Sequence, residues 1–244
     1  MKTQYNGPEM NGRKLLVLLL TAAVILILFL IRYRRPSDNA AGEPEQEKER
    51  QFVDISEYDS LMRAQEDSVF DWKLLSAIAY VESKFDTTLV SPMGATGLMQ
   101  IMPSTYNGIL REMDMDTTLR SAELDVIVAV RYLHKLDEMF SFINRKERLN
   151  YILGSYNCGA GHVFDAMRLA RRDGICRYNW ASLTPVLQSL SEEKVYTDSL
   201  CRNGKFNACE TLRYVEQVTR KYHEYRFLDL TFQASERISE NIKE

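Results

Sequence analysis

An apolar run near the amino terminus constrains this chain more than any other feature of its sequence. The seventeen residues 15–31 are all apolar except Thr21. As a helix at ~1.5 Å per residue, the run would reach about 25 Å, near the short end of what crosses a bilayer core. The sequence therefore predicts a transmembrane helix over residues 15–31, preceded by a short tail at residues 1–14.

The residues after the run distinguish a retained anchor from a cleaved signal peptide. A signal peptide usually has a shorter apolar stretch followed by small residues, whereas residues 32–35 read RYRR. This favours an uncleaved single-pass anchor, with a cleaved signal as the alternative. Basic residues stand on both sides of the run, so the positive-inside rule does not orient it.

The rest of the chain divides into a tether and a domain. Residues 32–51 are charged, contain Pro and Gly and lack apolar periodicity, which predicts a flexible tether. Residues 52–244 are enough for one sizeable core. The chain has 31 basic and 34 acidic residues and a net charge of −3. It therefore lacks the excess of basic residues expected of a protein that binds nucleic acid.

Apolar residues at helical spacing dominate residues 52–244, and no alternating pattern with a tight-turn signal predicts a hairpin. Asp71 is placed to cap a helix whose apolar residues continue to Val81. Further helices are predicted at residues 104–113, 126–140, 145–156, 160–172, 182–190 and 207–225. The expected fold class is therefore all-α.

The four cysteines are Cys158, Cys176, Cys201 and Cys209. An even number suits an oxidising compartment, and their spacing is not that of a zinc site. Cys201 and Cys209 flank a turn-rich stretch, which favours a short disulfide loop. The alternative is four reduced thiols in a cytosolic protein.

Glu82 is the first candidate for chemistry. It stands with Ser83 at the end of an apolar helix, where desolvation should raise the pKa of its carboxyl. An acid that stays protonated near neutral pH can donate a proton to the leaving oxygen of a glycosidic bond. Downstream, Gly94 and Gly97 let a backbone approach a ligand closely, and Gln100 offers both a donor and an acceptor. Together these residues predict a carbohydrate groove.

Three ordered motifs carry a resemblance to a known family. They read ESKF at residues 82–85, SPMGATGLMQIMPST at 91–105 and SYNCGAG at 155–161. The chain resembles the soluble lytic transglycosylase (SLT) domain over residues 58–225, and is most similar to the catalytic half of the F-type membrane-bound enzymes. The resemblance implies a goose-type lysozyme-like fold. It also implies cleavage of the β-1,4 bond between N-acetylmuramic acid and N-acetylglucosamine without water, giving 1,6-anhydromuropeptides.

The resemblance assigns Glu82 as the lone catalytic acid and later base, with no metal or cofactor. The residues that it places along the substrate groove are Ser91, Gln100, Met102, Ser155, Tyr156 and Glu210. Family members commonly carry Ala where Ser155 and Cys158 stand here. Glu210 has a second interpretation, because Asn207 precedes it in a helix-capping pattern.

A hydrolase of this kind would usually need a second carboxylate, and none stands in a comparable glycine-framed motif. Asp86, Asp114 and Asp116 are the alternatives. Without a second acid, the N-acetyl oxygen of the substrate would stabilise the cationic carbon, and the C6 hydroxyl would attack it within the same sugar. A muramidase of the same fold and an inactive peptidoglycan-binding module are the alternative functions.

The sequence thus predicts a membrane-tethered lytic transglycosylase of the bacterial cell envelope. Its catalytic domain, residues 52–244, would lie in the periplasm or face the cell wall. The expected partners are peptidoglycan glycan strands, the membrane through residues 15–31, and other cell-wall machinery.

Overall fold

The structure is a computed structural model that describes residues 53–115 and 119–243. These residues belong to the second of two units, which span residues 1–50 and 51–244. The predicted tail, the transmembrane helix and the whole of the tether lie outside the described residues. Within the described ranges, no helix combines the length and the apolar character needed to cross a bilayer.

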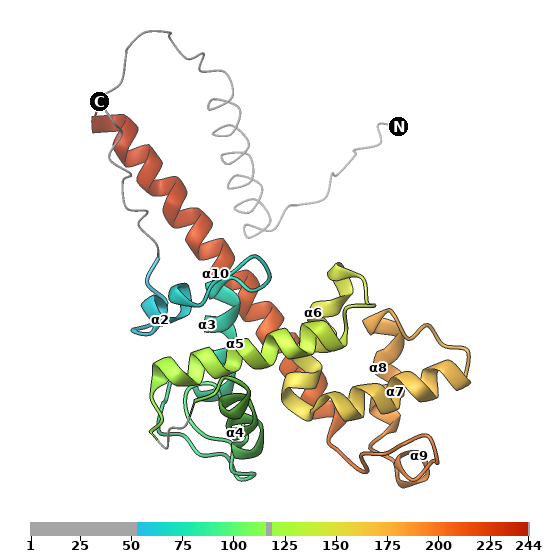
Figure 1. The fold of residues 1–244 in the computed structure, drawn as a ribbon. Helices are drawn as coiled ribbons and strands as arrows, with labels where there is room; N and C mark the ends of the chain where they lie inside the picture. Colours follow the sequence, from blue (N-terminus) through green and yellow to red (C-terminus); the bar gives the residue numbers. More distant parts are fainter. Residues whose placement is uncertain (1–52, 116–118, 244) are drawn as a thin grey trace, which may run out of the picture. The chain divides into compact units, whose positions relative to one another are not determined.

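Helices make up the described part of the chain, which contains no strand and only two isolated bridges, Val90 with Thr96 and Thr96 with Ile101 (Figure 1). The all-α prediction is confirmed for this part. The helices are α2 (Asp59–Ala64), α3 (Trp72–Ser83), α4 (Pro103–Glu112), α5 (Ala122–Met139), α6 (Arg145–Cys158), α7 (Ala160–Arg172), α8 (Trp180–Ser189), α9 (Glu193–Tyr196) and α10 (Ala208–Lys243).

Local signals explain where the helices begin. The Asp71 carboxylate accepts a hydrogen bond from the backbone N–H of Leu74 at 3.0 Å and so caps α3, as predicted. Pro103 occupies the first turn of α4. Helix α5 starts four residues before its predicted start, because Ser121 caps it by accepting from the N–H of Leu124.

Two clusters of buried side chains form the core. One is built around α3, α4 and α5, and the other around α7 and α8. Helix α6 serves both, since Ile152 and Leu153 belong to the first cluster and Tyr151 to the second. The first part of α10 packs against α3, α6 and α8. This arrangement brings the end of α3, the end of α6 and the start of α10 together.

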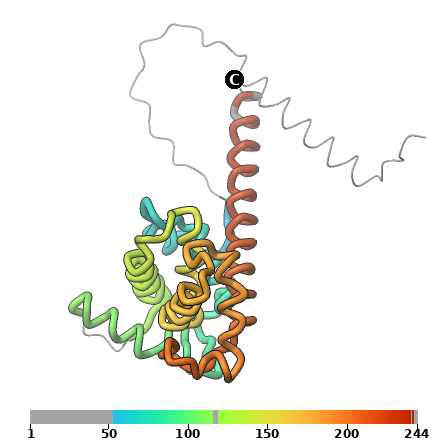
Figure 2. The backbone as a smooth tube through the Cα atoms, turned by 90° about the vertical axis from the view of Figure 1, so that its right-hand side faces the viewer, coloured from blue at the N-terminus to red at the C-terminus, as the bar shows by residue number. Residues whose placement is uncertain are grey.

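Helix α10 is far longer than the predicted residues 207–225. In Figures 1 and 2 its second half extends well beyond the rest of the described domain. Asp229 still forms an ion pair with Lys73 of α3 at 3.1 Å, and beyond it apolar side chains such as Leu230 and Ile238 are exposed. Short α9 and α2 were not predicted.

The four cysteines are all free thiols in this structure. The predicted disulfide loop between Cys201 and Cys209 is therefore not formed. The Cys201 thiol is half-buried with its Sγ 3.3 Å from the carbonyl of Val195, whereas Cys209 is exposed in the first turn of α10.

Candidate active site

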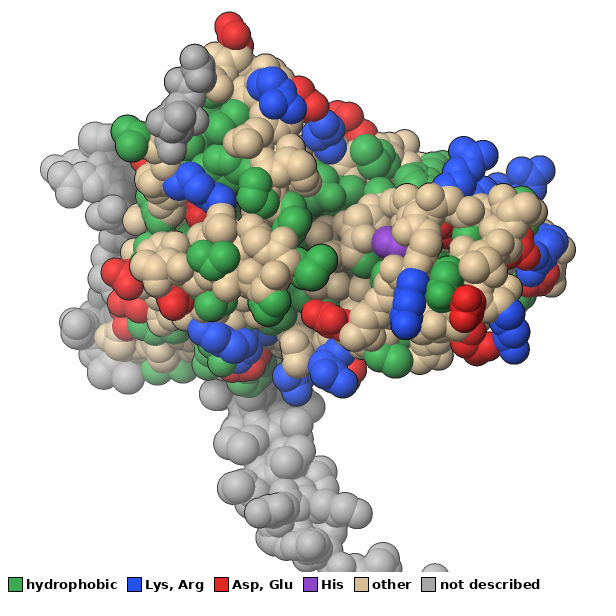
Figure 3. Space-filling model, turned by 90° about the horizontal axis from the view of Figure 1, so that it is seen from below, with side chains coloured by type: hydrophobic (Ala, Val, Ile, Leu, Met, Phe, Trp, Pro, Cys, Tyr) green, Lys and Arg blue, Asp and Glu red, His purple; other side chains and the backbone are tan. Residues whose placement is uncertain are grey.

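Glu82, the second-last residue of α3, lines a cavity of about 580 Å³. The walls come from the loop before α4, the end of α6 and the start of α10. The lining residues are Glu82, Ser91, Pro92, Met93, Ala95, Gln100, Ile101, Met102, Thr105, Tyr132, Tyr156, Asn157, Cys158, Gly159 and Glu210. Figure 3 looks onto the lower face of Figure 1, where α4 and the start of α10 lie. Hydrophobic and uncharged side chains fill its centre, and most charged ones stand towards its edges.

Desolvation dominates the chemistry of Glu82. Burial raises the pKa of its carboxyl from 4.5 to about 8, because the charged form loses its hydration inside the protein. The hydroxyl of Tyr214 on α10 lies near enough to lower this pKa in part, although it makes no hydrogen bond of standard geometry. A pKa of about 8 favours the protonated form of the Glu82 carboxyl at neutral pH, and its role as a proton donor stays a prediction.

Ser83 connects the helix that carries Glu82 to the glycine-rich loop. Its Oγ donates to the carbonyl of Leu98 at 2.8 Å and lies 3.2 Å from the carbonyl of Ala79 in its own helix. The next residue, Lys84, ends α3 in a left-handed conformation with φ 56°. The end of α3 is thus fixed to the wall of the cavity one residue beyond the acid.

A buried carboxylate from α5 holds the same loop from its other side. Asp125 Oδ2 accepts from the N–H of Leu98 at 3.0 Å, and its Oδ1 pairs with Arg120 at 2.9 Å. Arg120 in turn donates to the carbonyl of Thr96 at 3.0 Å. A Cβ on Gly97 would collide with this carboxylate, and Gly97 has φ +80°. The loop therefore needs glycine at this position for both space and conformation.

Tyr156 and Gln100 also use their donors to hold this loop. The Tyr156 hydroxyl donates to the carbonyl of Met99 at 2.9 Å, so its proton is not directed at Glu82. Gln100 has φ 47°, and its Nε2 donates to the carbonyls of Leu89 and Gly97, each at 2.9 Å. The donor role that the sequence suggested for Gln100 towards a sugar is thus taken up within the protein, which leaves its Oε1 as an acceptor.

Six of the seven residues predicted for the site line this one cavity. They are Glu82, Ser91, Gln100, Met102, Tyr156 and Glu210. Ser155 does not line it: the residue is fully buried, and its Oγ has no hydrogen-bond partner in the described residues. The roles of all seven towards a substrate stay predictions.

Glu210 takes part in the helix cap at Asn207 and also lines the cavity. Its backbone N–H donates to Asn207 Oδ1 at 3.3 Å, and its carboxylate accepts from Asn207 Nδ2 at 3.2 Å. It is the second carboxyl group of the cavity. Asp86 and Asp114 are exposed and do not line the cavity, and Asp116 lies outside the described residues.

Tyr132 and Asn157 also line the cavity and Tyr214 lies near the acid, although none of the three was predicted for the site. Asn157 lies inside the third motif and accepts a hydrogen bond from Thr211 at 2.8 Å, which links the ends of α6 and α10. Tyr132 and Tyr214 reach the site only through helix packing. Helical periodicity shows which face of a helix a residue occupies but not what that face packs against, so the sequence did not show that these two side chains reach the site.

The fold and the site together define an all-helical domain in which a half-buried acid lines a cavity whose other side chains are mainly uncharged. Residues 60–178 match the family model described as the Transglycosylase SLT domain. A membrane-bound lytic murein transglycosylase F of Desulfosudis oleivorans is 36% identical over 155 residues, covering 63% of this chain and 32% of the relative. A protein of the same name from Vibrio cholerae is 33% identical over 156 residues, covering 63% and 28%.

A solved structure shares the fold. The 70 kDa soluble lytic transglycosylase of Escherichia coli superposes with a TM-score of 0.51 at 21% sequence identity, covering 70% of this chain and 24% of that chain. The present chain spans about a third of the length of the curated relatives that it matches.

Proposed function

We propose that this protein is a peptidoglycan lytic transglycosylase, with Glu82 as its general acid and then its base. The observation that carries the proposal is the burial of Glu82, which raises its pKa to about 8 inside a groove lined mostly by uncharged side chains. A neutral carboxylic acid in such a groove suits proton donation to a glycosidic oxygen. The SLT family match and the curated relatives support the same activity.

In the first step, protonated Glu82 donates its proton to the oxygen that bridges the two sugars. The bond between that oxygen and C1 of N-acetylmuramic acid breaks, and the N-acetyl carbonyl oxygen bonds to C1 and takes up the positive charge. Tyr156, Ser83 and Asp125 contribute indirectly, because they hold the loop at residues 96–100 in place around the substrate.

In the second step, the Glu82 carboxylate removes the proton from the C6 hydroxyl of the same sugar. The C6 oxygen attacks C1 and displaces the N-acetyl oxygen, which closes a 1,6-anhydro ring and restores protonated Glu82. No water is consumed. A carboxylate that burial has made basic is a strong proton acceptor, so one environment serves both steps.

A muramidase is the second candidate, and Glu210 is the observation that favours it. Its carboxylate lines the same cavity as Glu82 and is exposed, as a base that activates water would be. The Asn207 side chain already holds this carboxylate through the helix cap, which argues for a binding and structural role instead.

The test is to incubate the purified full-length chain with peptidoglycan sacculi and to determine the masses of the released muropeptides. A transglycosylase gives anhydro products that are one water lighter than the hydrated sugars of a muramidase. Glu82→Gln should reduce release by at least about a thousandfold, because the amide can neither donate nor accept the proton. Undiminished release by this variant would contradict the proposal.

The matched control is Glu210→Gln, the same substitution in the same cavity. Under our proposal this variant still yields only anhydro products, with its loss confined to KM. If the variant loses kcat as severely as Glu82→Gln and the wild type yields hydrated sugars, the enzyme is a muramidase. Binding of sacculi without any released product would instead indicate a binding module.

We further propose that residues 15–31 anchor the protein in the membrane and that residues 32–51 tether the catalytic domain, residues 52–244, at the cell wall. The apolar run and the charged segment after it support this arrangement. A reporter that is active only outside the cytoplasm, fused after Glu244, should be active. An inactive fusion would contradict it.

A further inference from the structure

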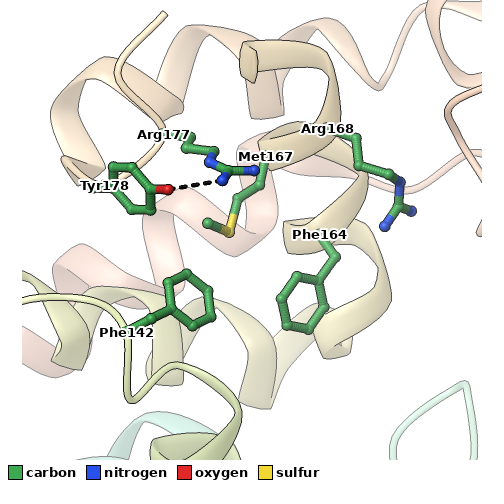
Figure 4. A pocket seen from close by; sticks show the side chains of 6 residues that line it. All are labelled: Phe142, Phe164, Met167, Arg168, Arg177 and Tyr178. Atoms are coloured by element: carbon green, nitrogen blue, oxygen red, sulfur yellow. Dashed lines mark hydrogen bonds between the residues drawn. The ribbon is translucent and has the colours of Figure 1, made fainter. Parts of the chain in front are cut away.

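A second cavity lies between the turn after α5 and the segment between α7 and α8 (Figure 4). It measures about 460 Å³, which is in the range of small-ligand sites. Its lining residues are Phe142, Phe164, Met167, Arg168, Arg177 and Tyr178. It shares none of them with the Glu82 cavity, so nothing in the proposed catalytic mechanism explains it.

Hydrogen bonds from α6 hold both walls of this cavity. Arg148 donates to the carbonyls of Ser141 and Ile143 at 2.9 and 3.1 Å, which fixes the turn that carries Phe142. The hydroxyl of buried Tyr151 donates to the carbonyl of Arg177 at 2.8 Å, which fixes the opposite wall. The cavity is therefore preformed, and a ligand would not have to order its walls.

Exposed aromatic side chains form the mouth. Phe142 is 53% exposed and Tyr178 is 46% exposed, with ring centroids 6.3 Å apart in an edge-to-face arrangement. Figure 4 shows Met167 pointing into the space between these walls, with the Phe164 ring beside it. Neighbouring aromatic rings that a rigid backbone keeps exposed to solvent are typical of binding sites. Aromatic residues that only fill a core are covered by other side chains.

The cavity also carries a positive charge that no acidic side chain of the described residues pairs with. Arg177 donates to the Tyr178 hydroxyl at 2.7 Å and has no carboxylate partner among the described residues. Arg168, by contrast, pairs with buried Asp165, and in Figure 4 its guanidinium points away from the aromatic rings. A fitting ligand therefore combines a carboxylate for Arg177 with small apolar groups for the rings.

We propose that this cavity binds the carboxylate-bearing stem peptide of a peptidoglycan strand, at a site separate from the catalytic groove. The inference rests on the proposed function, because stem peptides are the carboxylate-bearing peptides that surround an enzyme working on the wall. Their short alanyl side chains match the apolar walls, and their free carboxylates match the unpaired guanidinium. The site would hold the enzyme to a peptide-bearing strand while the groove acts on glycan.

The test is calorimetric titration of the full-length chain with the free tripeptide L-Ala-γ-D-Glu-L-Lys, which carries no sugar. The wild type should bind it, and Arg177→Gln should weaken binding about tenfold or more through loss of the charge-assisted hydrogen bonds. Phe142→Ala should also weaken it, and because this side chain is exposed the fold should be retained. Amidation of the peptide's carboxylates should have the same effect as Arg177→Gln.

The matched control is Arg171→Gln, which removes an exposed arginine of α7 that does not line the cavity. This variant should bind the tripeptide as the wild type does. Equal affinity of wild type and Arg177→Gln, no binding by the wild type, or displacement of the tripeptide by chitotetraose would each overturn the proposal. Release of naked glycan products by Arg177→Gln should equal that of the wild type, so failure here is distinguishable from failure of the proposed function.

Discussion

At the scale of single residues, the environment of the Glu82 carboxyl group decides its protonation state. The pKa of Glu82 is raised chiefly by burial and lowered in part by the Tyr214 hydroxyl. A pKa of about 8 means that the acid stays protonated up to about pH 8 and ionises above it. The kcat/KM for wall cleavage should accordingly fall as the pH rises through this value.

Tyr214→Phe tests this balance. The substitution removes the group that lowers the pKa of Glu82, so that pKa should rise further. The alkaline limb of the kcat/KM profile should then move to higher pH, by roughly half a unit to one unit. Tyr132→Phe is the control, since Tyr132 lines the cavity without affecting the Glu82 pKa. A limb that stays in place or moves to lower pH would refute the role assigned to Tyr214.

The sequence was sufficient to predict that Glu82 and the glycine-rich loop lie together, because both belong to one continuous stretch of motif, and the structure places them around one cavity. The sequence could not locate Tyr214, which is 132 positions from Glu82 and reaches the acid only through the packing of α10 on α3. Ser155 shows that a motif can also predict a lining residue that the structure buries instead. Its motif predicts a groove residue, but its position on α6 turns the side chain into the core.

At the scale of elements, the loop at residues 96–100 is fixed more firmly than a surface loop requires. Ser83, Asp125 and Tyr156 reach it from three different helices and satisfy its backbone groups. Their geometry also explains why Gly97 in this loop is not equivalent to Gly94, which precedes the loop. Gly97 faces the Asp125 carboxylate, whereas a Cβ on Gly94 would meet nothing within 4 Å.

Gly97→Ala and Gly94→Ala form a matched pair, because both positions have positive φ, +80° and +86°. Gly94→Ala should reduce the free energy of unfolding by about 1 kcal/mol, the cost of the backbone conformation alone. Gly97→Ala should cost at least about 3 kcal/mol and impair wall cleavage, because the methyl group must displace the Asp125 carboxylate. Denaturant unfolding measures both losses, and equal losses would contradict the close approach of the Asp125 carboxylate to Gly97.

The starts of α3 and α4 were predictable because Asp71 and Pro103 mark them, whereas the cap at Ser121 was not recognised and the start of α5 was predicted four residues late. Helix α10 was not bounded in this way. Its apolar face ends near Tyr225, so the periodic pattern that predicted the helix stopped there, while the backbone continues to Lys243. A pattern that depends on burial cannot detect helix that has no core to face.

At the scale of the whole described domain, α10 runs from the candidate active site to its own exposed second half, which extends beyond the other helices. Its start carries Glu210 and Tyr214, and its middle is fastened to α3 by buried Tyr225 and by hydrogen bonding of Tyr222 to Asp71 at 2.7 Å. Among the described residues, the ion pair of Lys73 with Asp229 is the last side-chain link from α10 to another helix. Stability should therefore depend on α10 only up to about that residue.

Two truncations test this division of α10. Removing residues 234–244 deletes exposed helix, so the free energy of unfolding should change by less than about 0.5 kcal/mol, with wall cleavage retained. Removing residues 222–244 also deletes Tyr222, Tyr225 and Asp229, and should cost more than about 3 kcal/mol, because a buried ring and two buried polar links to α3 are lost. Circular dichroism during denaturant unfolding measures both. If the shorter truncation costs as much as the longer one, the outer half of α10 packs against a surface beyond the described residues.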